Sequence, residues 1–222
     1  MSDLNLDMLD ADGAIRESAE SAGFGRSDFL KRSALAGGGL VAGGAFFSYL
    51  GPAEAAISKT RRSKANDVKI LNFALTLEFL EAAFYKQAVA NKAYGASAPL
   101  KQFAEIVARH EAAHVTFLKK ALGSSAIKSP TFDFGKAVTD QATFAATAQV
   151  LEDTGVNAYL GQVTNVFQRG VLGAAGTIAT VEARHAAWIR FINGVTPAPK
   201  TFDVRKSEAA ILSAVGETGF IK

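Results

Sequence analysis

Two glutamate–histidine pairs with the same spacing stand out in this chain. Glu111 and His114 lie three residues apart, and Glu182 and His185 repeat that spacing. Residues three apart on an α-helix share a face, so in each pair a carboxylate and an imidazole point the same way. Carboxylate oxygens and imidazole nitrogens are both ligands for divalent transition metals. The two pairs therefore predict metal chemistry.

The first pair also fits a second pattern, His110-Glu111-x-x-His114. H-E-x-x-H on a helix is typical of zinc proteases, in which both histidines bind zinc and the glutamate is the general base. The extended metzincin form of that pattern needs a glycine and a histidine where this chain has Phe117 and Lys120. A zinc site also leaves the second pair without a role. We therefore disfavour a zinc protease and expect His110 to be a partly exposed or accessory residue.

Two further glutamates, Glu78 and Glu152, lie within apolar stripes at helical spacing, as do the glutamates of the two pairs. Four buried carboxylates repel one another and must be neutralised by protons, partners or metal. The two histidines favour metal, because four carboxylates balance two divalent cations and each imidazole adds one donor. The predicted ligands are Glu78, Glu111, His114, Glu152, Glu182 and His185.

Four long helices are needed to position these six residues. Apolar periodicity predicts helices at about 67–91, 98–122, 139–167 and 172–193. The stretch 168–173 is expected to be a turn. The connection between the second and third helices is long enough to return along the edge of a bundle. The predicted fold is thus an all-α four-helix bundle with a long crossover between helices two and three.

Short phrases in the two halves resemble each other, since LEFLEAAFY (77–85) aligns with LEDTGVNAY (151–159) and EAAHVTFL aligns with EARHAAWI. Together with FDFGKAVTD, these phrases resemble exported bacterial ferritin-like domain proteins, a group that includes desiccation-related homologues, over about residues 66–194. The resemblance implies a ferritin-like bundle with a dinuclear site. By position, the two single glutamates and the two glutamate–histidine pairs are its ligands, and this sequence departs from the pattern at none of them.

Three other residues have open roles. Glu81, one turn after Glu78, is either a spare carboxylate that shuttles metal or an acid at the edge of its helix. Tyr85 and Tyr159 each lie seven residues after a predicted single ligand. They are either buried tyrosines with hydrogen-bonded hydroxyls or redox-active neighbours of the site.

The first 55 residues predict an export signal rather than part of the bundle. An acidic leader precedes a basic patch, an apolar run at 34–50 and a cleavage-type triplet at 53–55. Arg26 to Lys31 resembles a twin-arginine box, although Ser27 replaces the second arginine. The expected location is periplasmic or extracellular, and the alternative is a membrane anchor at 34–50. We divide the rest of the chain into a bundle at 56–195 and a tail at 196–222, with a short helix at about 207–215.

Composition narrows the possible functions. The chain has 222 residues and no cysteine, which excludes disulfides, thiolate zinc sites and a built-in rubredoxin-type electron donor. Residues 56–222 carry twenty bases and thirteen acids, but the bases are scattered, so we expect no nucleic-acid partner. Oligomer formation remains open.

Three functions fit the predicted site. The first is a di-iron protein that oxidises Fe(II) or reduces O₂ or peroxide, with an external electron donor for repeated turnover. The second is a catalase with two manganese ions in the same ligand set. The third is a non-enzymatic bundle that binds metal or protects against stress.

Overall fold

The computed structural model describes residues 57–58 and 62–222. The predicted leader, the signal and the alternative anchor at 34–50 all lie outside this part. Among the described residues, no helix is both long and apolar enough to cross a membrane.

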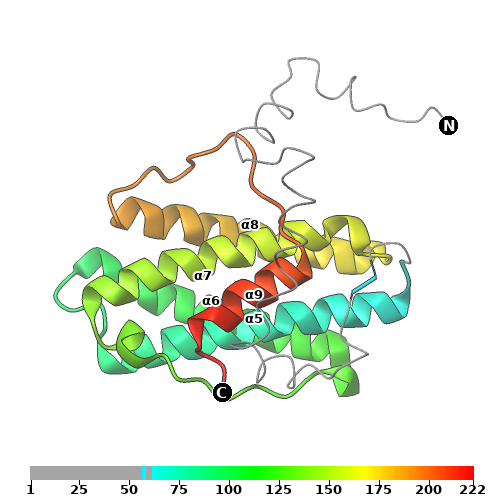
Figure 1. Cartoon of the computed structure of the whole chain (residues 1–222), viewed down its shortest axis with the longest axis horizontal. Helices are drawn as coiled ribbons and strands as arrows, with labels where there is room; N and C mark the ends of the chain where they lie inside the picture. The colour runs from blue at the N-terminus through cyan, green and yellow to red at the C-terminus, as the bar shows by residue number, and fades with distance from the viewer. Residues whose placement is uncertain (1–56, 59–61) are drawn as a thin grey trace. The chain divides into compact units, whose positions relative to one another are not determined.

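Four long helices make up the body of the described chain, and they run alongside one another in Figure 1. They are α5 (Lys64–Asn91), α6 (Ala98–Leu122), α7 (Gln141–Gln162) and α8 (Arg169–Ile192). α5 packs mainly on α6, and α7 mainly on α8. Strand pairing in the described residues is limited to one bridge, between Phe132 and Ile221. The predicted all-α bundle is confirmed.

Side-chain caps fix where three of these helices begin. The side chains of Ser63, Ser97 and Asp140 each accept a hydrogen bond from the backbone N–H three residues later. Such caps satisfy N–H groups that have no partner within the helix. Because Ser63 caps α5, that helix starts at Lys64, three residues before the predicted start.

The turn between the third and fourth helices was predicted at residues 168–173, and this position is wrong. α7 ends at Gln162, five residues early, and a short 3₁₀ turn, η4 (Val163–Asn165), follows it. The stretch expected to be a turn is largely helical, because α8 already begins at Arg169. Its glycines at 170 and 173 suggested a turn, but each costs a helix only about 1 kcal/mol relative to alanine, which tertiary packing offsets.

The buried side chain of Asp67, near the start of α5, holds this link in place. Its carboxylate accepts the backbone N–H of Phe167 at 2.8 Å and that of Gln168 at 2.9 Å. The end of α6 also lies near the start of α5, since Asn72 bonds to the backbone of Ser125 and Ile127. Because α6 and α7 end at the same end of the bundle, residues 123–140 must return along its length, which is the predicted crossover.

We expect Asp67→Ala to destabilise the protein without a direct effect on metal binding. Two backbone N–H groups lose their acceptor, and leaving buried donors unpaired costs about 1–3 kcal/mol each. Chemical denaturation of the metal-free protein measures the loss. Asp133→Ala, at a 65 % exposed side chain, is the control and should change stability by less than about 0.5 kcal/mol. Equal effects of the two substitutions would contradict this role of Asp67.

The C-terminal segment is part of the packed core. A fifth helix, α9 (Glu208–Thr218), is capped by Ser207 and packs on α7. Its buried residues Ile211, Leu212 and Val215 join the same apolar cluster as Phe84 and Phe144. The sequence predicted a short helix here, and its packing on α7 stabilises the bundle.

Candidate metal centre

The structure brings the six predicted ligands together inside the bundle. Each of the four long helices contributes one glutamate, and all four glutamates have 0 % exposure. His185 is 3 % exposed and the His114 side chain 12 %. The apolar stripe of each helix therefore carries its acid into a common interior.

These residues form two overlapping groups, each able to surround one ion. Glu78 and His114 belong to the first group, and Glu152 and His185 to the second. Glu111 and Glu182 belong to both groups. Within each group, one potential ligand atom from every residue lies within 4.8 Å of the others. The arrangement has two terminal glutamates, two shared glutamates and one histidine for each position, which suits two adjacent divalent cations.

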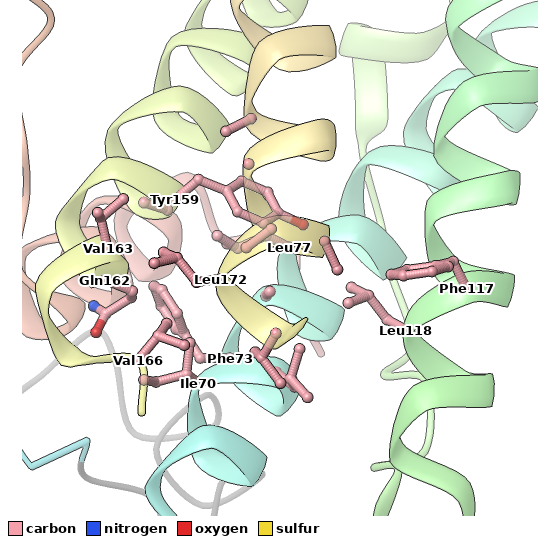
Figure 2. A pocket seen from close by; sticks show the side chains of 18 residues that line it. Ile70, Phe73, Leu77, Phe117, Leu118, Tyr159, Gln162, Val163, Val166 and Leu172 are labelled. Carbon is pink, nitrogen blue, oxygen red and sulfur yellow. The ribbon is translucent and has the colours of Figure 1, made fainter. Parts of the chain in front are cut away.

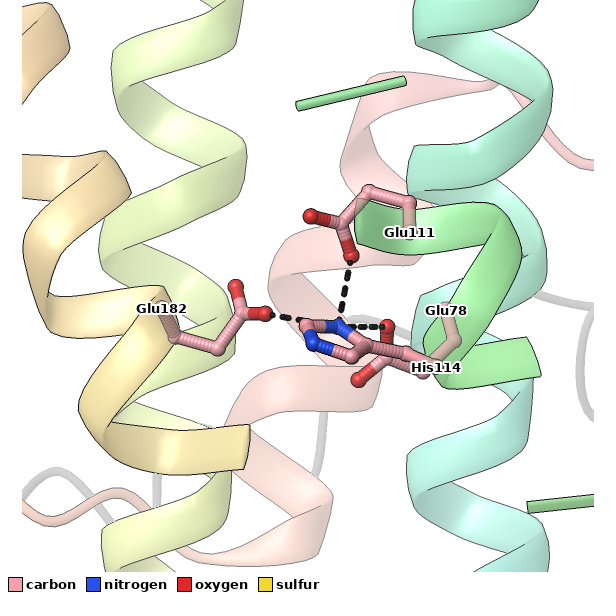
Figure 3. A group of neighbouring side chains, drawn as sticks. All are labelled: Glu78, Glu111, His114 and Glu182. Atoms are coloured by element: carbon pink, nitrogen blue, oxygen red, sulfur yellow. Dashed lines mark hydrogen bonds and ion pairs between the residues drawn. The ribbon is translucent and has the colours of Figure 1, made fainter. Parts of the chain in front are cut away.

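Ring nitrogens Nδ1 of both histidines point into this interior. Nδ1 of His114 lies 3.2 Å from carboxylate oxygens of Glu78, Glu111 and Glu182. Figure 3 shows these three carboxylates, which come from three helices, gathered around that nitrogen. Nδ1 of His185 lies 3.2 Å from Glu111 and 3.3 Å from Glu152.

Protons neutralise the cluster in the metal-free protein. Burial raises the pKa of Glu78 to about 8. Burial and the charge of Glu111 also raise the pKa of Glu182 well above its ordinary value. For the histidines, burial opposes the charged form, but close contacts with carboxylates outweigh it and raise the pKa of His114 to about 12 and that of His185 to about 10.

Glu111 is the one acid of the cluster that this environment favours as an anion. Burial opposes its ionisation, but the close contacts with the rings of His114 and His185 outweigh burial and lower the pKa of Glu111 to about 2. In the metal-free protein, Glu111 is thus the counter-ion of two imidazolium groups.

Protein groups alone leave several polar atoms of the cluster unsatisfied. Five buried atoms have at most a charged neighbour at 3.2 Å or more and no hydrogen bond of suitable geometry, namely Oε1 of Glu111, Oε2 of Glu152, both carboxylate oxygens of Glu182, and Nδ1 of His185. Such atoms are rare in folded proteins, because each loses its hydration without compensation. All of them belong to the ligand groups described above. The donor set and its unsatisfied atoms therefore fit a pair of bound cations.

The two predicted tyrosines hold the terminal glutamates from across the bundle. The hydroxyl of Tyr159, on α7, donates to Glu78 on α5 at 2.5 Å. The hydroxyl of Tyr85, on α5, donates to Glu152 on α7. Partners of this kind orient a metal ligand and tune its basicity. The contacts match the hydrogen-bonded alternative, and any redox role for the tyrosines stays a prediction.

His110 contacts the site through one of the ligands. Its Nδ1 lies 2.8 Å from Nε2 of His185, and the two rings stack with centroids 5.1 Å apart. His110 belongs to neither ligand group among the described residues. The H-E-x-x-H pattern thus yields one ligand histidine, His114, and one accessory histidine at the surface.

Glu81 adds a fifth buried carboxylate to this interior, so of its two predicted roles the acid at the helix edge is wrong, and the metal-shuttling role stays a prediction. Its side chain is 3 % exposed, and burial, with the charges of Glu182 and Glu152, raises its pKa well above the ordinary value. Gly155 faces the carboxyl groups of Glu81 and Glu182. A Cβ atom there would lie 3.4 Å from Oε1 of Glu81 and 3.1 Å from Oε2 of Glu182. Sequence analysis missed this glycine, although it stands three residues after Glu152, where the other motifs carry histidine.

The fold and the site together define a class, that of helical bundles with a carboxylate- and histidine-rich centre shared by four helices. The family model described as "Ferritin-like domain" matches residues 66–194. The chain belongs to this ferritin-like family. No curated protein matches the chain significantly.

Proposed function

We propose that this protein binds two iron ions and uses them to oxidise Fe(II) or to reduce O₂ or peroxide. The observation that carries the proposal is the pair of overlapping ligand groups that share Glu111 and Glu182. Four carboxylates match the charge of two divalent cations, and hard oxygen ligands with one imidazole per ion suit iron and manganese.

The residues of the chain have separate roles in this proposal. Glu78 and His114 hold one ion, Glu152 and His185 hold the other, and the shared glutamates keep the two ions adjacent. Tyr85 and Tyr159 orient the terminal carboxylates. Bound iron would supply the redox chemistry. Glu81 lies beside Glu182 without belonging to either group, and its carboxyl is placed to hold a proton near the reacting centre.

An anaerobic Fe(II) titration of the full chain tests the proposal. We expect two irons per chain, followed on exposure to air by a ferric absorption band that appears faster than iron oxidises in buffer. One iron per chain, or none, would contradict the dinuclear site. Two bound irons with an oxidation rate equal to that of buffer would favour a non-enzymatic metal-binding protein.

The metal in the purified protein decides between iron and manganese. Elemental analysis of protein produced without added metal should show iron. Manganese together with rapid O₂ evolution from peroxide would instead identify a catalase, which needs no external electron donor.

We expect His110→Ala to weaken metal binding while leaving the fold intact. Partners of ligand histidines fix the orientation of the ring, and their loss typically lowers metal affinity by about 10–100-fold. Mn(II) competition titrations measure the affinity without oxidation of the metal. Because His110 holds only the histidine of the second group, one of two bound ions should weaken far more than the other. A uniform loss at both positions, or none, would contradict this role.

We also propose that the protein is exported, on the basis of the basic patch, apolar run and cleavage-type triplet between residues 26 and 55. N-terminal sequencing of the native protein should give a start just after Ala55. An intact chain found in the membrane fraction would favour the anchor at 34–50.

A further inference from the structure

Beside the metal centre lies a second cavity, of about 270 Å³, between the four long helices. It occupies the layer of the bundle next to the ligands. On α6 its wall includes Leu118, four residues after His114, and on α8 it includes Ala179, three residues before Glu182. Figure 2 shows the side chains that line this cavity, with Tyr159 among them.

The cavity has an almost wholly apolar lining. Among the lining residues only Tyr159 and Gln162 have polar ends, and an oxygen of each is already bonded to another residue. The Tyr159 hydroxyl donates to Glu78, and Oε1 of Gln162 accepts a hydrogen bond from Asn165. A charged or strongly polar ligand would lose its hydration here without compensation. The lining therefore selects uncharged, apolar molecules.

The size and opening of the cavity suit a small molecule. An apolar cavity of about 150 Å³ stays dry and binds benzene, so this larger one admits a longer hydrocarbon. Three of its lining residues are exposed at the surface, Phe117 by 44 %, Val163 by 42 % and Leu172 by 39 %. They provide an apolar entrance. The wall on α8 is built from small residues, among them Ala175 and Ala179, which leave the space unfilled.

We propose that this cavity binds the hydrocarbon chain of a small aliphatic molecule, with the inner end of the chain against the ring of Tyr159. The cavity is thus a ligand site separate from the metal ligands but joined to them through the contact of Tyr159 with Glu78. This proposal does not depend on the identity or presence of the metal.

Titration calorimetry of the metal-free full chain with 1-hexanol, 1-octanol and 1-decanol tests it. We expect one saturable site per chain. Affinity should rise roughly fourfold for each added methylene and stop rising once the chain fills the cavity. A rise that continues without limit, as at a non-specific surface, or no saturable binding, would overturn the proposal.

Variants locate the binding. Ala175→Phe fills the cavity and should weaken 1-octanol binding at least tenfold, and Phe117→Ala, at the exposed entrance, should weaken it without endangering the fold. Thr177→Leu adds bulk to an exposed position of the same helix outside the cavity and should leave binding unchanged. Equal losses in Ala175→Phe and Thr177→Leu would overturn the site. A dimer would also overturn the site if light scattering shows that it forms with rising concentration, Phe117→Ala abolishes it and 1-octanol fails to bind. A second copy of the chain would then cover the entrance.

Discussion

We expect Glu182→Gln to abolish binding of the proposed metal pair and to leave the metal-free protein at least as stable as the natural chain. Glu182 is shared by both ligand groups, so its loss affects both ions. Loss of an outer partner of a ligand already costs about 10–100-fold in affinity, so loss of this shared ligand should cost more than about 100-fold. Mn(II) titration measures the effect.

The metal-free Glu182→Gln variant should keep its stability because Glu182 is protonated in the metal-free protein. Burial and the charge of Glu111 raise the pKa of Glu182 well above its ordinary value, so the metal-free protein holds this carboxyl neutral. Glutamine has the same shape and is also neutral. The melting temperature without metal should therefore stay equal or rise. A marked fall would show that Glu182 stabilises the fold as a charged group.

Glu111→Gln is the informative comparison, because it also removes a shared ligand but should destabilise the metal-free protein. Glu111 is the anion that pairs with both histidines, and removing one partner of a buried ion pair costs about 3–5 kcal/mol. Glu105→Gln, at a 40 % exposed side chain on the same helix, controls for the chemical change alone. It should alter neither stability nor metal binding.

The second large effect is thermal stabilisation by metal. A ligand that binds only the folded state at about 1,000 times its dissociation constant adds about 4.1 kcal/mol. For a chain of this size, each 1 kcal/mol raises the melting temperature by roughly 2–4 °C. Saturating Mn(II) should therefore raise it by about 8–16 °C in calorimetry. Chelation with EDTA should reverse the shift, and Glu182→Gln should not show it.

The stabilisation by metal should grow as pH rises. Burial raises the pKa of Glu78 to about 8, so this group contributes stability that is complete below its ordinary value of 4.5 and is lost as pH rises through 8. Glu182 acts in the same direction. The metal-free protein should therefore melt at lower temperature at pH 8.5 than at pH 5.5. Metal binding requires deprotonated ligands and strengthens over the same range. A metal-induced shift that shrinks with pH would falsify the assignment of these groups as ligands.

Helix periodicity and the spacing of six side chains were enough to predict the bundle and the cluster that the structure assembles. Each glutamate lies in the apolar stripe of its own helix, so packing the stripes together also brings the acids together. The crossover was predictable for a similar reason, since only a long connection allows α6 and α7 to end near Asp67.

The errors arose where a residue's role depends on another helix. The two roles that the sequence left open for Glu81 could not be separated on its own helix, because the carboxyl lies against Gly155 of α7. The start of α8 depends on Asp67, about 100 residues away in sequence. The partner of His185 is His110, 75 residues away, and no local pattern joins them. Local periodicity contains no information on such contacts.

Neither half of the chain can surround an ion alone. The first ligand group has Glu78, Glu111 and His114 in the α5–α6 hairpin, but it needs Glu182 from α8. The second group has Glu152, Glu182 and His185 in the α7–α8 hairpin, but it needs Glu111 from α6. In a polypeptide severed within the crossover, cation uptake would therefore add to the apolar contacts that already hold the two fragments together. If two ions bind as proposed, each would join residues of both hairpins, so the metal-loaded protein should resist separation of the hairpins more than the metal-free protein does.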